Sequence, residues 1–178
     1  MATQYEYLNS DLEKFIKAQK IFFVATAMET GRVNLSPKGM DTFRVLDSNR
    51  AMWLNLTGSG NETATHLQHS ERITIMFCSF EKKPLILRLY GKAKVYHPRD
   101  NEWKEYIKLF PKEAGSRQLV DIEIEMVQTS CGYSIPFMDY TGERDVLRKA
   151  SEKKGDEGVK KQIGRAHVLN SSHVAISY

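Results

Sequence analysis

Residues 55–66, with the sequence NLTGSGNETATH, hold the residue types of this chain that are best suited to chemistry. The apolar run of residues 51–54 leads into them, and a helical pattern over residues 62–69 follows. This order predicts a strand, a polar loop with two glycines, and the start of a helix.

The predicted loop has the groups needed to hold a phosphate. Gly58 and Gly60 allow backbone conformations that other residues resist, and the first amides of a helix have no partner within it. The side-chain donors around these glycines are Asn55, Thr57, Ser59, Asn61 and Thr63. The spacing is not that of a Walker loop, and an ordinary capped turn is the alternative that the pattern also allows.

Composition narrows the class of protein. The 178 residues, 41% of them hydrophobic, suffice for one domain with a core. The 26 basic and 22 acidic residues are interspersed, so nucleic-acid binding is not expected. The chain has neither an apolar run of about 18 residues nor a basic and then apolar N-terminus, so we expect a cytoplasmic protein without membrane contact. Cys78 and Cys131 lack the spacing of a metal site and are expected to be reduced thiols.

Residues 163–178 are interpreted as an artefact of sequencing rather than as part of the native protein. Their sequence, IGRAHVLNSSHVAISY, looks like a translated sequencing adapter with a frame slip after Val168. The native domain is therefore expected to cover residues 1–162.

Most of the predicted elements are strands. They cover residues 21–28, 32–36, 42–47, 51–56, 72–80, 85–97 and 118–131, and helices are predicted near residues 10–20, 61–69, 98–110 and 142–158. Ser10 and Glu13 suggest a capping box, and Pro37 is expected to end its strand. Hairpin-length connections favour a mainly β fold, a closed antiparallel barrel with helices packed outside.

Several segments together resemble the pyridoxamine 5'-phosphate oxidase-like family of FMN-binding split barrels. These segments are NLSPKG at 34–39, WLNLTGSGNET at 53–63, MFCSFE at 76–81 and LRLYGKA at 87–93. The similarity covers residues 12–131, and SCGY at 130–133 resembles an uncharacterised branch of the family. It implies a six-stranded antiparallel split barrel and a homodimer with FMN held in clefts between the subunits.

The residues agree with such a ligand. Lys38 lies beside the predicted strand break, and Arg88 lies within an apolar strand where it needs an anion or water. Ser36 adds a hydroxyl. The alternatives are a solvated turn for Lys38 and the outer barrel face for Arg88. Glu62 is expected to complement the helix dipole and His66 to face solvent. Trp53 is expected to be a core or dimer-contact aromatic rather than one that stacks on a flavin.

The expected function is that of an FMN-dependent oxidoreductase with a small-molecule substrate or electron donor. Genuine pyridoxamine 5'-phosphate oxidases end with an Arg-x-His motif, which is absent before Ile163, so that particular activity is not expected. A non-catalytic flavin carrier or sensor, and a barrel that binds deazaflavin or haem, are the alternatives. Because the flavin supplies the redox chemistry, the sequence identifies no catalytic side chain.

Overall fold

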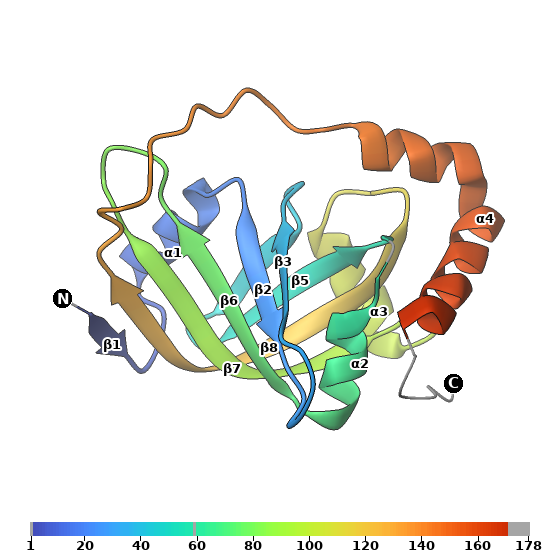
Figure 1. The fold of residues 1–178 in the computed structure, drawn as a ribbon, viewed down its shortest axis with the longest axis horizontal. Helices are drawn as coiled ribbons and strands as arrows, with labels where there is room; N and C mark the ends of the chain where they lie inside the picture. The colour runs from blue at the N-terminus through green and yellow to red at the C-terminus, as the bar shows by residue number, and fades with distance from the viewer. Residues whose placement is uncertain (1, 59, 171–178) are drawn as a thin grey trace.

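A single antiparallel sheet organises the chain (Figure 1). The computed structural model describes residues 2–58 and 60–170, and their side chains except those at 156, 160 and 162–170. In chain order the elements are β1 (Thr3–Tyr5), α1 (Ser10–Ala18), β2 (Phe22–Thr26), β3 (Asn34–Lys38), β4 (Phe43–Asp47), β5 (Arg50–Leu56), α2 (Glu62–His69), β6 (Arg72–Cys78), β7 (Ile86–Tyr96), α3 (Asn101–Tyr106) with a 3₁₀ turn (Ile107–Leu109), β8 (Ser116–Ser130) and α4 (Val146–Asn170).

The sheet curls into a split barrel, which confirms the predicted fold class. Its strands follow the order β3-β2-β6-β7-β8-β5-β4, and β1 pairs with β8 off this path. The described sheet therefore has eight strands rather than the six that the resemblance implied. The expectation of a closed barrel was wrong, because β3 and β4 end the path without pairing with each other among the described residues. The short β1 carries too little pattern to be found by periodicity.

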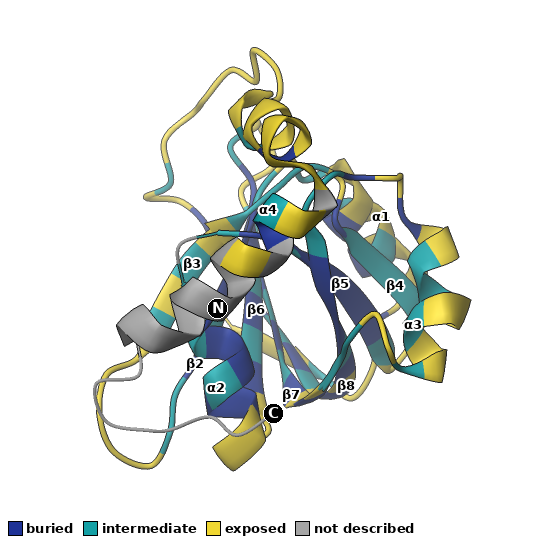
Figure 2. Cartoon of the chain, turned by 90° about the vertical axis from the view of Figure 1, so that its right-hand side faces the viewer, coloured by how far each residue is buried: buried dark blue, intermediate teal, exposed yellow. Residues whose placement is uncertain are grey.

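The barrel interior is filled by alternate residues of the long strands. On β7, Leu87 and Leu89 are fully buried between half-exposed Arg88 and Tyr90, as the two-residue period of a strand requires. β5 is buried on both faces, as Figure 2 shows. Its Trp53 belongs to the barrel core, as predicted, while its Leu54 packs in a second cluster with Phe110 beneath α3.

Two local expectations fail for identifiable reasons. α1 is capped by Asn9 rather than by Ser10, since the Asn9 side chain accepts bonds from the amides of Asp11 and Leu12. Pro37 does not break its strand but lies within β3, opposite Phe23. An edge strand tolerates proline because one side of it needs no ladder hydrogen bonds.

The helices cover the barrel unequally. α2 packs onto the sheet, and its His66 is buried and bonded through Nδ1 to Thr26 Oγ1 at 3.0 Å, so the expectation of a solvent-facing histidine was wrong. The charged helix α4 begins at Val146 and kinks at Gly155, whose φ is 62°. The end of the proposed adapter sequence, 171–178, lies outside the described residues.

The two cysteines are far apart in the sequence. Cys78 is buried, Cys131 is exposed, and both are free thiols. The described residues hold no group of three or more histidine, cysteine or acidic side chains that could bind a metal. Among them no helix combines the length and apolarity needed to cross a membrane.

Candidate functional site

A cleft of about 360 Å³ opens where β3 and β5 end and the glycine loop begins. Six of the ten residues predicted from the sequence line it: Ser36, Lys38, Asn55, Thr57, Gly58 and Gly60. Its other described lining residues are Asn34, Pro37, Gly39, Met40, Thr42, Trp53, Leu54, Leu56, Glu62, Arg117 and Leu147. The structure therefore brings segments from residue 34 to residue 147 to one place.

The remaining four predicted residues have different positions. Asn61 and Thr63 are buried where α2 begins, and Thr63 Oγ1 accepts a bond of 3.0 Å from the side chain of Asn34. Ser59 lies outside the described residues. Arg88 is not a lining residue: it shares the outward face of β7 with Tyr90 and donates to Ser130 Oγ at 3.1 Å.

The edge strand β3 supplies one wall of the cleft. Asn34, Ser36 and Lys38 are alternate residues, so they lie on one face of β3, and all three are partly buried. Leu35, on the opposite face, is 63% exposed. The polar residues of this strand consequently face the cleft while an apolar one faces outward.

Lys38 is partly buried, close to an aromatic ring and to a second cation. Its Nζ lies 5.2 Å from the centre of the Trp53 ring. Burial lowers the pKa of Lys38, the positive charge of Arg117 lowers it further, and the Glu62 carboxylate partly offsets both effects. A bound anion would relieve both the desolvation and the repulsion.

Arg117 is the cation that sequence analysis missed. The β5–β8 register shifts between Asn55 and Leu56, which pair with Gln118 and Ser116, so that Arg117 is the extra residue of a bulge. A bulge redirects a side chain out of the normal alternation. The Arg117 side chain is almost fully buried, and its Nη2 donates to the carbonyl of Gly60 at 3.0 Å.

Thr57 offers a buried hydroxyl at the cleft. Its backbone amide donates to the Gly115 carbonyl at 2.7 Å, which fixes the start of the loop. Its Oγ1 is buried and has no hydrogen-bond partner among the described residues. Buried polar atoms are nearly always satisfied in folded proteins, so this hydroxyl is suited to a ligand.

Glu62 has a place in the cleft as well as at the start of α2. It is the acidic residue among the described lining residues, which also include two cations, Lys38 and Arg117. A side chain at position 60 would displace this carboxylate, which is the flexible end of the Glu62 side chain. The described lining thus has a net positive charge, which favours an anionic ligand.

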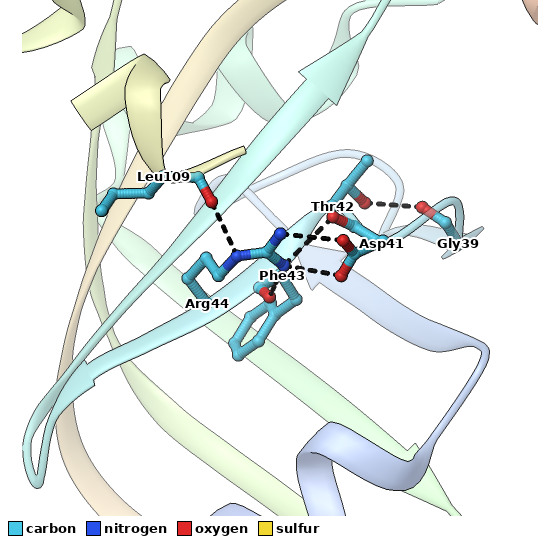
Figure 3. A network of polar contacts seen from close by, with 6 residues as sticks. All are labelled: Gly39, Asp41, Thr42, Phe43, Arg44 and Leu109. Atoms are coloured by element: carbon cyan, nitrogen blue, oxygen red, sulfur yellow. Dashed lines mark hydrogen bonds and ion pairs between the residues drawn. The ribbon is translucent and has the colours of Figure 1, made fainter. Parts of the chain in front are cut away.

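A strained turn at residues 39–44 borders the same cleft (Figure 3). Met40 and Asp41 have φ values of 64° and 53°, which are unusual for residues other than glycine. Arg44 holds the turn by donating to both carboxylate oxygens of Asp41, at 2.7 and 2.9 Å, and to the Leu109 carbonyl at 2.9 Å. Strain of this kind persists where surrounding contacts enforce it, often at functional sites.

Together, the fold and the cleft define a split-barrel protein whose cleft, beside the glycine loop, has a described lining of net positive charge. The family model described as pyridoxamine 5'-phosphate oxidase matches residues 8–131. A pyridoxamine 5'-phosphate oxidase family protein of Aspergillus flavus, ustO, is 37% identical over 142 residues. This chain therefore belongs to the pyridoxamine 5'-phosphate oxidase family. The match takes in 77% of this chain but only 57% of ustO, so the chain spans less than two thirds of that relative.

Solved structures share the fold at low sequence identity. A variant of HupZ from Group A Streptococcus has a TM-score of 0.56 and 17% identity, over 68% of this chain and 98% of HupZ. The FAD binding protein of Mycobacterium smegmatis has a TM-score of 0.50 and 11% identity, over 71% of this chain and 97% of that protein. α4 lies beyond the residues that the family model matches.

Proposed function

We propose that the cleft binds FMN and that the chain is an FMN-dependent oxidoreductase of this family. The observation that carries the proposal is the convergence of Lys38 and Arg117 on one cavity beside the glycine loop. A phosphate monoester has a charge between about −1.5 and −2 at neutral pH, which two cations can balance. Membership of the family supports a flavin as the rest of the ligand.

The residues present fit such a ligand. Lys38 and Arg117 would hold the phosphate, and the Thr57 hydroxyl would gain the partner that the described residues do not provide. Ser36, Asn55, Gly58 and Gly60, which also line the cleft, would add hydrogen bonds. A cavity near 360 Å³ lies within the usual range of about 300–1,000 Å³ for small-molecule sites.

With a flavin bound, the protein would need to supply little acid–base chemistry of its own. A bound flavin would exchange electrons with the substrate, while these residues would bind and orient it. Lys38 and Arg117 would hold the phosphate end of the flavin in place. The buried side chains of Trp53 and Leu54 would exclude water from that part of the cleft. Glu62 is the described lining residue that could accept a proton.

An absorption spectrum of the protein purified without added cofactor is the first test. We expect flavin absorption, and in the stripped protein we expect binding of FMN at least about 100-fold tighter than of riboflavin, because two charged contacts are lost without the phosphate. A colourless protein that binds neither compound would refute the proposal. Absorption typical of haem or deazaflavin would assign another cofactor to the same barrel.

Reduction of the bound flavin separates an enzyme from a carrier. An oxidoreductase should be reduced by a nicotinamide or another small donor under anaerobic conditions and reoxidised by an acceptor with turnover. A protein that binds FMN tightly, but whose flavin is reduced no faster than free FMN by each donor tested, would instead be a flavin carrier or sensor.

We further propose a homodimer with the cofactor at the subunit interface. The support is the outer face of the edge strand β3, where Val33, just before the strand, is 70% exposed and Leu35 is 63% exposed, beside residues that line the cleft. Light scattering coupled to size-exclusion chromatography should give twice the chain mass. Leu35→Asp should produce monomers with weakened FMN binding, and a monomeric wild-type protein that binds FMN fully would contradict this proposal.

A further inference from the structure

The first turns of α4 form part of the cleft wall. Leu147 lines the cleft although it lies far along the chain from the glycine loop. Ser151 follows four residues later, so both side chains lie on the same face of the helix. Ser151 is only 3% exposed, which shows that this face packs against the barrel. Figure 1 shows α4 on the side of the barrel toward which β5 points.

An ion pair between the partly exposed Arg148 and the buried Glu113 connects α4 to the barrel. Arg148 donates to Glu113 through Nε at 3.0 Å and through Nη2 at 2.6 Å. The Glu113 side chain is only 5% exposed. Removing Arg148 would leave a buried carboxylate without its cation, which is strongly unfavourable while α4 stays docked.

Gly115 lies against both α4 and the residue at the start of the glycine loop. Its φ is +84°, and a Cβ there would lie 2.7 Å from Ser151 Oγ and 2.8 Å from the methyl carbon of Thr57. Ser151 and Thr57 therefore both pack closely against Gly115. Since Thr57 also offers its buried hydroxyl to the cleft, α4 stands directly beside the anion-binding end.

We propose that α4 closes the phosphate end of the cleft and makes the site selective for FMN over FAD. This inference rests on the proposed flavin function and assigns Leu147 and the Arg148–Glu113 pair to specificity. A terminal phosphate can end against a closed wall. The diphosphate of FAD must continue outward to its adenosine, so its entry requires α4 to move away from Gly115 and the Arg148–Glu113 pair to break.

The test compares FMN and FAD binding to the stripped full-length protein, followed by quenching of flavin fluorescence. The variants are Leu147→Ala, Arg148→Ala and the control Lys149→Ala, which removes an adjacent exposed cation that pairs with Asp145. Wild type and Lys149→Ala should prefer FMN strongly. Arg148→Ala should reduce this preference by at least about 10-fold, mainly by admitting FAD, and Leu147→Ala should reduce it less.

Hydrogen exchange on the same variants locates the change. In Arg148→Ala, exchange should increase over residues 146–154 while β5 and β8 stay protected. Equal affinity of the wild type for FMN and FAD, or an unchanged preference in Arg148→Ala, would overturn the role of α4 and leave the flavin site intact. Loss of both flavins by Arg148→Ala with a protected sheet would also overturn it, because α4 would then bind the shared part of the ligand. A wild-type protein that binds neither flavin would refute both proposals.

Discussion

Strands β5 and β8 have an arginine near each end of their pairing, and the two arginines have different neighbours. At one end, Arg50 donates to both carboxylate oxygens of Asp121, at 2.9 and 2.8 Å. Its guanidinium also lies 5.1 Å from the Tyr106 ring centre. The hydrogen bonds to Asp121 raise the pKa of Arg50, which shows that its charge is stabilised by the protein itself.

At the other end, Arg117 donates to the backbone carbonyl of Gly60 and lowers the pKa of Lys38. Two like charges thus share a cavity that a small anion could enter. Matched charges on the same two strands stabilise the fold, whereas like charges placed beside a cavity favour ligand binding. The neighbours of an arginine, rather than its burial alone, therefore indicate its role.

Exchanging each arginine for alanine should separate binding from stability. Arg117→Ala should weaken FMN binding about 100-fold, because charged hydrogen bonds contribute about 1.5–3 kcal/mol each. Arg50→Ala should leave FMN affinity within about twofold but lower the free energy of unfolding by about 1–3 kcal/mol, since Asp121 loses its cation. Calorimetric titration and urea unfolding measure the two effects. Equal binding losses in both variants would contradict the comparison.

Lys38 should make FMN binding depend on pH. Its lowered pKa means that the free protein loses this proton at a pH below the ordinary value of 10.5, and only the protonated form attracts the phosphate. Affinity should therefore fall as pH rises through that lowered pKa, by about 10-fold in total, while Arg117 stays charged.

Two substitutions isolate this effect. Lys38→Arg should flatten the alkaline decline, because a guanidinium keeps its proton there. Lys38→Ala should show low affinity at every pH. A wild-type profile that stays level while the protein remains folded would remove Lys38 from the phosphate site.

The part of the candidate site that follows local rules could be predicted from the sequence. The glycine loop was predictable because an apolar run, small polar residues and a helical pattern are adjacent in the chain. Lys38 and Ser36, which line the cleft, were predicted with the help of a resemblance to a family motif. The strands were predicted from alternation and apolar runs, and their number and short connections indicated a mainly β barrel. That the barrel is split rather than closed came from the resemblance to the family.

The missed residues depend on tertiary structure. Arg117 precedes the predicted strand 118–131, and no local pattern indicates that a bulge directs it into the cleft. Leu147 belongs to a charged helix whose sequence does not specify where it docks. His66 was expected in solvent because its partner, Thr26, is 40 residues away. In each case the deciding contact joins segments that are remote in sequence.

Tyr96 tests, with a smaller expected effect, whether the groups around Arg50 and Asp121 stabilise the fold. Its hydroxyl donates to Asp121 Oδ2 at 3.1 Å, and burial, followed by the Asp121 charge, raises the pKa of Tyr96 to about 12. The unfolded chain ionises first, near pH 10, so stability should fall as pH rises from about 10 to about 12.

Tyr96→Phe checks the assignment by thermal unfolding across this range. At neutral pH the variant should lose about 1 kcal/mol because the hydrogen bond to Asp121 is gone. Its stability should then decline less steeply than that of the wild type above pH 10, and FMN affinity should be unchanged. Parallel declines in the two proteins would show that other groups control the alkaline transition.

Replacement of Arg88 should change FMN affinity least among these variants, in contrast to replacement of Arg117. This arginine was predicted to bind phosphate, yet it lies on the outer face of β7 with Ser130 and does not line the cleft. Arg88→Ala should change FMN affinity by less than about twofold if one chain supplies the whole phosphate site, because an exposed polar contact contributes little. A loss comparable to that of Arg117→Ala would have another meaning. Since Arg88 cannot then act through its own cleft, the cleft of a second subunit would have to contain it, and mixed dimers with one Arg117→Ala and one Arg88→Ala chain would retain one functional site.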